Sequence, residues 1–435
     1  PPVSLPDLKE YKEIAIDLET RDPNLLTMGS GSVRGDGEVI GIAVAVEGWS
    51  GYFPINHEGG GNMDRALTLD WFEEVLHTPA TKIFHNAMYD VSWIRSLGFQ
   101  INGGIVDTLI AASLINENRW GYSLNALGKE YVGMGKNEKI LNEAAKDWGV
   151  DPKSEMWRLP APLVGEYAEQ DAIVTLKLWH ALQHEISKQD LWDVFNMETN
   201  LFPCLVDMKF KGVRVDIDKA EALKKQLTVT EKDMHRDIKK LAGFDVEIWA
   251  AASIAKAFDK EKIPYDRTEK GAPSFTKNFL ATHPAELPKL INEAREINKA
   301  NTTFIETILK HNHKGRIHSD INQIRSDDGG TVTGRFSYSN PNLQQIPARH
   351  KELGPLIRSL FIPEKDTKWG CFDYSQQEPR LVVHFASLLK LEGTSTIVDA
   401  YKEGSADFHQ MIADMAGIER KQAKTINLGL MYGMG

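Results

Sequence analysis

The sequence lacks the features of secreted and membrane-spanning proteins. It has only two cysteines in 435 residues, Cys204 and Cys371, so we expect no disulfide framework, and a reducing cytoplasm suits the chain. It contains no run of about 18 apolar residues, and we therefore expect no membrane span. It also has no internal repeat and no low-complexity tract.

The chain also lacks the positive charge that is typical of nucleic-acid-binding proteins. Its formal net charge is −10, which argues against DNA or RNA binding over the whole surface. This argument is weak, because clustered catalytic carboxylates raise the acidic count and a binding groove needs only local positive charge. Hydrophobic residues make up 42% of the chain, enough to bury the cores of several domains.

The hydrophobic pattern changes along the chain. EIAIDL, VIGIAVAV and TKIFHN are short apolar runs typical of buried strands, and helix patterns follow near DVSWIRSLG and in VGEYAEQDAIVTLKLWHALQHEIS. Long charged helix patterns occupy the chain from about residue 191, and a loop-rich segment covers about 313–347. KWGCFDYS then predicts a strand and EPRLVVHFASLL a helix. We place one domain boundary near 190 and a softer one near 320.

Two short patterns near the N-terminus place three acids beside strands. Asp17 and Glu19 lie two apart in IAIDLET, so on a strand they point to one face. Alone, such a pair is more often a solvated strand end than a metal site. NAMYD adds Asp90 at a strand-to-helix turn; alternatively, Asn86 caps the helix and Asp90 lies on the surface.

A third pattern, YAEQD, puts Tyr167 and Asp171 one turn apart on a long helix. Taken singly, it is a common surface pattern. Four acids and a tyrosine from two strand ends and a helix, however, could hold two Mg²⁺ ions about 4 Å apart, an arrangement that cleaves phosphodiesters. Hard divalent ions prefer oxygen ligands, and no Cys/His set indicates zinc.

The C-terminal third carries further motifs. TVTGRFSYSNPNLQQIP alone predicts a surface loop. CFDYSQQEPR places Asp373 at the end of the expected strand and Glu378 at the start of the next helix, and DFHQMIADMAGI contributes His409.

In the last helix, positions four apart share one stripe, and Gly433 ends the helix. The stripe consists of Arg420, Lys424, Leu428 and Tyr432. Standing alone, this helix would be an amphipathic packing helix with solvated cations.

Together these motifs resemble known families. D-x-E, N-x3-D and Y-x3-D, in this order, resemble the 3′–5′ exonuclease domains with four acids and a tyrosine. T-x-T-G-R-x-S, N-P-N-L-Q-x-I-P, D-Y-S-Q-x-E and R-x3-K-x7-Y-G resemble family A DNA polymerases, which include bacterial DNA polymerase I and many phage replicases.

The resemblance covers nearly the whole chain and implies a fold and a function. It implies an α/β, ribonuclease H-like exonuclease domain over 1–190, an α-rich thumb over 191–320, a partial palm over 321–395 and partial fingers over 396–435. The implied activity is template-directed DNA synthesis with 3′–5′ proofreading. The compact layout is similar to that of a phage enzyme, which would act in the cytoplasm of a bacterial host.

The resemblance also assigns roles. The implied metal ligands, for two Mg²⁺ per active site with Mn²⁺ as an alternative, are Asp17, Glu19, Asp90 and Asp171 in the exonuclease site and Asp373 in the polymerase site. Tyr167 would orient the attacking water. The implied nucleotide-binding residues are Glu378, His409, Arg420, Lys424, Leu428 and Tyr432, with Lys424 also counted as catalytic. Arg335 and Gln345 would contact the primer–template minor groove, whose acceptors are shared by all correct pairs.

Two departures from the family pattern matter. Leu428 stands where the family usually has Phe or Tyr. No His-Asp-Glu tripeptide, the family's source of a second palm aspartate, occurs in these 435 residues. We therefore expect the N-terminal part of a split polymerase, with a C-terminal polypeptide, primer–template DNA and deoxynucleoside triphosphates as partners. The rivals are a chain that only degrades 3′ ends and a non-catalytic subunit that binds primer–template.

Overall fold

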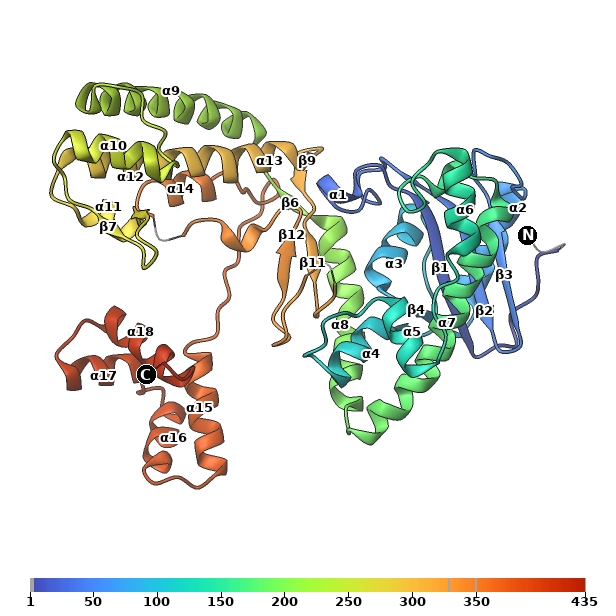
Figure 1. The fold of residues 1–435 in the computed structure, drawn as a ribbon. Coiled ribbons are helices and arrows are strands. Elements are labelled where there is room, and N and C mark those ends of the chain that lie inside the picture. The colour runs from blue at the N-terminus through green and yellow to red at the C-terminus, as the bar shows by residue number, and fades with distance from the viewer. Residues whose placement is uncertain (1–3, 328, 349, 435) are drawn as a thin grey trace. The chain divides into compact units, whose positions relative to one another are not determined.

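The computed structural model describes residues 4–327, 329–348 and 350–434. Contacts divide the chain into two units, with the division between Glu364 and Lys365 (Figure 1). No helix in the described ranges is long and apolar enough to cross a membrane.

A five-stranded sheet organises the first part of the larger unit, in the order β3-β2-β1-β4-β5. The central strand β1 runs antiparallel to β2 and parallel to β4. The strands are β1 (Glu13–Arg21), β2 (Glu38–Val46), β3 (Trp49–Pro54), β4 (Thr81–Phe84) and β5 (Ile105–Asp107). The three apolar runs therefore form the predicted strands, whereas the polar-flanked strand β3 was not predicted from the sequence.

Helices cover both faces of this sheet, because successive residues of its strands point to opposite sides. Ala15 of β1 belongs to a core shared with α4–α7, whereas Ile14 and Ile16 belong to a core shared with α2, α3 and part of α8. The helices are α1 (Leu25–Met28), α2 (Arg65–His77), α3 (Ala87–Ser96), α4 (Thr108–Ile115), α5 (Leu124–Tyr131), α6 (Lys139–Trp148), α7 (Ala161–Lys188) and α8 (Trp192–Lys211), with a 3₁₀ turn at Met156–Arg158. The result is the three-layer α/β arrangement expected for this part of the chain.

Helix α7 is the longest helix of this α/β part and packs against β1, β2 and β3 (Figure 1). It begins after Pro160, and Pro162 occupies its first turn, where the missing N–H of proline carries no penalty. The buried residues Ala168 and Ala172 have small side chains, so the helix lies close to the strands. Position 171, between them in the helix, is also buried.

The larger unit continues as a helical region with short strands. Asp216 caps α9, accepting from the Lys219 amide at 3.0 Å, and Gly243 ends the helix in the left-handed conformation. Helix α9 packs along α12 (Figure 1). The helices are α9 (Ile217–Ala242), α10 (Ala251–Lys260), α11 (Lys277–Thr282), α12 (Glu286–Lys299), a π turn (Ala300–Ile305), α13 (Glu306–Lys310), a 3₁₀ turn (Leu343–Gln345) and α14 (Leu353–Arg358). The strands are β6 (Val213–Arg214), β7 (Asp266–Arg267), β8 (Pro273–Ser274), β9 (Asn312–His313), β10 (Arg316–Ile317), β11 (Asp320–Asn322) and β12 (Ser337–Ser339).

The smaller unit is helical. It contains α15 (Gln377–Leu388), α16 (Thr394–Lys402), α17 (Phe408–Ala416) and α18 (Arg420–Met431). The strand predicted in KWGCFDYS is wrong: the described residues of this unit form no strand. A strand needs a neighbouring strand to take its backbone hydrogen bonds, and the described residues of this unit include no second strand. Phe372 is accordingly 96% exposed and Tyr374 80% exposed.

Candidate functional site

The first group of candidate residues starts on β1. Asp17 and Glu19 alternate with the apolar residues of the strand, so both leave it on the side of Ala15, which faces α7. Glu19 pairs with Gly41 of β2 and is only 9% exposed. A Cβ on Gly41 would lie 2.0 Å from the Tyr52 hydroxyl, so glycine at this position gives the Tyr52 ring room beside the acid.

Asp90 joins this group from the first turn of α3. It is 4% exposed, and its Oδ1 accepts from the Leu18 amide of β1 at 2.9 Å. The alternative of a surface Asp90 is therefore wrong. Nor does the Asn86 side chain cap the helix. Instead, the buried carboxylate of Asp107 accepts from the backbone amides of Asn86 and Ala87, at 2.9 and 2.8 Å.

Helix α7 contributes the remaining two predicted residues. Asp171 is 2% exposed, so the surface alternative for this position is also wrong. A residue that was not predicted joins them: Lys136, from the segment between α5 and α6. Its ammonium forms an ion pair with Asp171 Oδ2 and donates to the Tyr167 hydroxyl at 3.0 Å.

The electrostatics link these side chains into one cluster. Burial raises the pKa of Asp17 to about 7, with a contribution from the charge of Asp171. Burial and neighbouring acids raise the pKa values of Glu19 and Asp90 well above their ordinary value. Burial also raises the pKa of Asp171, although Lys136 opposes that effect. Four carboxyl groups are thus held where they repel one another, which is the environment that a bound cation relieves.

The donor set fits a hard divalent ion. It offers carboxylate oxygens, and Asp171 Oδ1 is buried without a hydrogen-bond partner, an orphaned acceptor that a cation would satisfy. As the side chains lie, no three His, Cys, Asp or Glu residues of the described ranges form a metal-binding group. The Lys136 ammonium lies on Asp171 instead, and its charge also acts on Asp17.

The smaller unit holds a second group around α18. Glu419 and Gln422 form a capping box at its start, and Gly433, with φ of +80°, follows its end as predicted. The Tyr432 hydroxyl donates to Glu378 Oε1 at 2.7 Å, so the structure brings two predicted nucleotide-binding residues together.

The other predicted residues of this unit have different surroundings. Arg420 Nε donates to Asp407 Oδ2 at 2.9 Å, and Asp373 is exposed. His409 is 3% exposed, with its Nδ1 3.1 Å from the Asn427 side-chain nitrogen of α18. Lys424 is exposed and Leu428 half-buried on the predicted stripe. His409 therefore contacts α18 here, and its role towards a nucleotide stays a prediction.

In the larger unit, Arg335 lies on an exposed loop and Gln345 is an exposed residue of the 3₁₀ turn at Leu343–Gln345. The Gln344 side chain donates to the Phe336 carbonyl at 2.9 Å and joins the turn to the loop. Arg335 and Gln345, the two residues expected to contact the minor groove, therefore lie in one region of the surface.

Comparisons with known proteins agree with this layout. Residues 217–435 match DNA polymerase family A, and residues 5–187 match the 3′–5′ exonuclease family. The chain is 38% identical to a DNA-directed DNA polymerase of Pseudomonas phage M6, covering 99% of this chain and 68% of that protein. This chain belongs to DNA polymerase family A.

Other relatives of this family A chain come from phages and bacteria. DNA polymerase DpoZ of Salmonella phage PMBT28 is 32% identical, over 99% of this chain and 71% of that protein. DNA polymerase I of Pseudomonas aeruginosa is 29% identical, over 99% of this chain and 47% of that protein. A solved structure of the POL domain of Pol1 from M. smegmatis, in complex with DNA primer-template and dNTP, has the same fold: its TM-score is 0.73 at 20% identity, covering 98% of this chain and 69% of that one.

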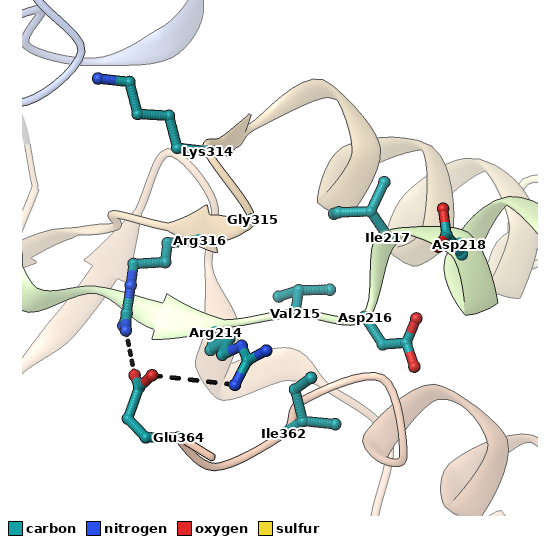
Figure 2. A pocket seen from close by; sticks show the side chains of 10 residues that line it. All are labelled: Arg214, Val215, Asp216, Ile217, Asp218, Lys314, Gly315, Arg316, Ile362 and Glu364. Atoms are coloured by element: carbon teal, nitrogen blue, oxygen red, sulfur yellow. Dashed lines mark hydrogen bonds and ion pairs between the residues drawn. The ribbon is translucent and has the colours of Figure 1, made fainter.

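A polar cavity of about 460 Å³ lies elsewhere in the larger unit, beside β6 and β10 (Figure 2). Glu364 forms ion pairs there with Arg214 and Arg316. The charged side chains that line the cavity are Arg214, Lys314 and Arg316 against Asp216, Asp218 and Glu364. The positive and negative side chains are equal in number, and the two arginines hold Glu364, the last residue of the larger unit.

The contacts of three residues of this family A chain were not predicted from the sequence. Lys136 lies in a segment without periodicity, so no sequence signal could have found it. Asp107, at the end of the apolar run IVD, could have been found as the capping residue of α4. Gln376 donates to the Ala406 carbonyl at 3.1 Å and accepts from the Phe408 amide at 3.0 Å, which ties the start of α15 to the start of α17.

Proposed function

We propose that this chain removes nucleotides from DNA 3′ ends at the acid cluster between β1, α3 and α7. The observation that carries the proposal is the burial of Glu19, Asp90 and Asp171 beside Asp17, with Asp90 bonded to the amide of Leu18, next to Asp17 on β1, and with Asp171 Oδ1 left without a hydrogen-bond partner. In this reaction a water attacks the last phosphodiester, the bond from phosphorus to the 3′ oxygen breaks, and a nucleoside monophosphate leaves.

The residues that would hold two Mg²⁺ ions, or Mn²⁺ in their place, are Asp17, Glu19, Asp90 and Asp171. Bound there, the ions would supply a lower pKa for the attacking water and charge stabilisation for the leaving oxygen. Tyr167, one turn before Asp171 on α7, would orient the water through its hydroxyl. The buried cluster would hold these groups in place before the substrate arrives.

We further propose that the chain takes part in templated DNA synthesis. Asp373 would bind the catalytic Mg²⁺, and Arg420 and Lys424 would bind the triphosphate, since guanidinium and ammonium groups bind phosphate oxygens. Positioning and electrostatics supply nearly all that phosphoryl transfer requires.

The remaining polymerase residues would set selectivity and geometry. Glu378, fixed by the Tyr432 hydroxyl, would lie beneath the sugar, where it would exclude a 2′-hydroxyl. Leu428 would contact the sugar, and Tyr432 would lie near the template base. The nucleotide-contacting role expected of His409 would require it to leave Asn427, whereas Arg335 and Gln345 are already exposed for contact with primer–template DNA.

Further acidic ligands, such as the second palm aspartate of the family, would complete the polymerase site. Support comes from Asp373 itself: one exposed carboxylate is a poor site for two divalent ions, which need further anionic ligands. Its neighbours Trp369, Phe372 and Tyr374 are 59, 96 and 80% exposed. These exposed aromatic side chains form a surface that further palm strands would cover.

One experiment tests these proposals together. A labelled primer–template is incubated with the chain and Mg²⁺, with and without deoxynucleoside triphosphates and with and without the polypeptide that carries the His-Asp-Glu stretch. We expect shortening by the chain alone and extension only with the partner.

Variants assign each activity to its site. Asp17→Ala with Glu19→Ala should abolish shortening but leave duplex binding intact, and undiminished shortening would remove these residues from the site. Asp373→Ala should abolish extension and leave shortening unchanged. Shortening without extension under all conditions would favour the exonuclease-only alternative, and binding without either reaction would favour a non-catalytic subunit. Extension by this chain alone, unaffected by the partner, would contradict the split polymerase.

A further inference from the structure

We propose that Lys136 is a positioning residue for the hydrolysis of DNA 3′ ends: its ammonium holds Asp171 and Tyr167 in their working orientations. The inference rests on the exonuclease function proposed above and deepens it. The D-x-E, N-x3-D and Y-x3-D patterns do not include this residue.

The segment that carries Lys136 is fastened at several points. The Lys136 amide donates to Asn125 Oδ1 of α5 at 3.0 Å. From α7, Gln170 donates to the Gly135 carbonyl at 3.3 Å, and Glu166 accepts from the Asn137 side chain at 2.7 Å. Residues on both sides of Lys136 are therefore bonded to the helix that carries Tyr167 and Asp171. This bonding directs the lysine side chain towards the cluster rather than into solvent.

The ammonium contacts only one of the two carboxylate oxygens of Asp171. It is bonded to Oδ2, whereas Oδ1 is buried without a partner. A carboxylate held by one oxygen presents the other in a fixed direction, which is how residues behind metal ligands orient them. Lys136 can therefore stay in place while Oδ1 binds a cation.

The same ammonium fixes the direction of the Tyr167 hydroxyl. Lysine has no acceptor, so in the 3.0 Å contact the tyrosine oxygen must accept. In the metal-free chain the tyrosine proton is directed to Asp171, and with Asp171 engaged by a metal ion it would be free to donate to the attacking water. The ammonium also lies 5.0 Å from the centre of the Tyr167 ring, within the range of a cation–π contact. One side chain thus sets the geometry of both a metal ligand and the water-orienting group.

The net charge of the metal-loaded cluster gives Lys136 a second role. Four ionised carboxylates carry four negative charges, and two divalent ions cancel them. The lysine then leaves one positive charge, which matches the single negative charge of a bound phosphodiester. The Lys136 ammonium is paired with the Asp171 carboxylate, so it adds its positive charge directly at the cluster.

The test compares Lys136→Met and Lys136→Arg in the full chain, with Lys139→Met as the matched control. Lys139 lies three residues further on, at the exposed start of α6. The substrate is a single-stranded oligonucleotide with a labelled 5′ end, degraded over a series of Mg²⁺ concentrations that reaches saturation. Thermal unfolding is measured in EDTA and again with Mg²⁺, without DNA.

For Lys136→Met we expect kcat at saturating Mg²⁺ to fall about 10- to 100-fold, the range seen when groups behind metal ligands are removed, with KM changed less than about twofold. The Mg²⁺-induced rise in Tm should become larger than in the wild type, because the metal-free cluster carries one more uncompensated negative charge. Loss of a residue with only a structural role would not both lower kcat and increase the stabilisation by Mg²⁺. Lys136→Arg, which keeps the charge and the donors, should retain more activity than Lys136→Met, and Lys139→Met should match the wild type.

Several outcomes would overturn the inference. These are a wild-type kcat for Lys136→Met at saturating Mg²⁺, a loss that extra Mg²⁺ fully restores, or equal losses in Lys136→Met and Lys136→Arg. If Lys136→Met does not fold, Lys136→Gln and Lys136→Arg give the same comparison. The double variant Asp17→Ala with Glu19→Ala distinguishes a failure of the proposed exonuclease site from a failure of the proposed role of Lys136. If that double variant still degrades DNA, the exonuclease site is wrong, whereas if it is inactive and Lys136→Met is fully active, only the role of Lys136 is wrong.

Discussion

The acid cluster should destabilise the metal-free protein in a pH-dependent way, and Asp17→Asn should relieve this. The pKa of Asp17 is raised from 3.8 to about 7 in the folded chain. The folded protein therefore holds this proton more tightly than the unfolded chain, so stability falls as pH rises from the unfolded pKa towards the folded one. Above about pH 7 the penalty is complete.

The magnitude follows from the two pKa values. Linkage gives a penalty for Asp17 that grows by about 3 kcal/mol between pH 5 and pH 8. The site lies in the larger unit, Pro1–Glu364, where this corresponds to a Tm change of a few degrees. In EDTA, Asp17→Asn should therefore unfold at a higher temperature than the wild type at pH 8, with a much smaller difference at pH 5.

The assay is thermal unfolding in EDTA across this pH range, followed by far-ultraviolet circular dichroism. Asp70→Asn is the control, because Asp70 is an exposed aspartate on α2; it should follow the wild-type curve. Addition of Mg²⁺ at pH 8 should stabilise the wild type and have less effect on Asp17→Asn. An Asp17→Asn variant with the wild-type pH dependence, or with a lower Tm at pH 8, would refute the reasoning.

Three further predictions concern single residues. Leu428→Tyr should raise dideoxynucleotide incorporation by a polymerase-competent assembly, because leucine lacks the hydroxyl of the family's tyrosine version; equal use of both sugars by the wild type would contradict this. Glu378→Ala should admit ribonucleotides and release the Tyr432 hydroxyl, and unchanged selectivity between ribo- and deoxynucleotides would place the steric gate elsewhere. Gly41→Ala should displace the Tyr52 ring, since the added Cβ would lie 2.0 Å from its hydroxyl, and should lower the free energy of unfolding by about 1–3 kcal/mol in urea titrations; an unchanged value would show that the ring moves freely.

Local periodicity predicted much of the exonuclease region. Alternation along β1 placed Asp17 and Glu19 on one face, and helical spacing placed Tyr167 and Asp171 on one face of α7. Both statements depend on residues close in sequence, so they needed no knowledge of the fold. The burial of Asp171 could not be predicted in this way, because it depends on α7 packing against strands β1, β2 and β3, which lie more than a hundred residues earlier.

Other features depended on partners that local patterns do not reveal. Lys136 reaches the cluster because its segment is bonded to α5 and α7, and these contacts are invisible in the sequence of the segment. The apolar run before Asp373 predicts a strand, but a strand also needs a neighbour, and the described residues of the smaller unit provide none. The end of helix α18 was predicted correctly because Gly433 is a local signal.

The central claim is that Asp17, Glu19, Asp90 and Asp171 hold the ions of a DNA 3′-end hydrolysis site. Anomalous diffraction from crystals of this chain soaked in Mn²⁺ tests it most directly. The account predicts two anomalous peaks about 4 Å apart, bounded by these four carboxylates, and their loss in Asp17→Ala with Glu19→Ala. Peaks only at other acidic residues, or peaks that persist unchanged in the double variant, would contradict it.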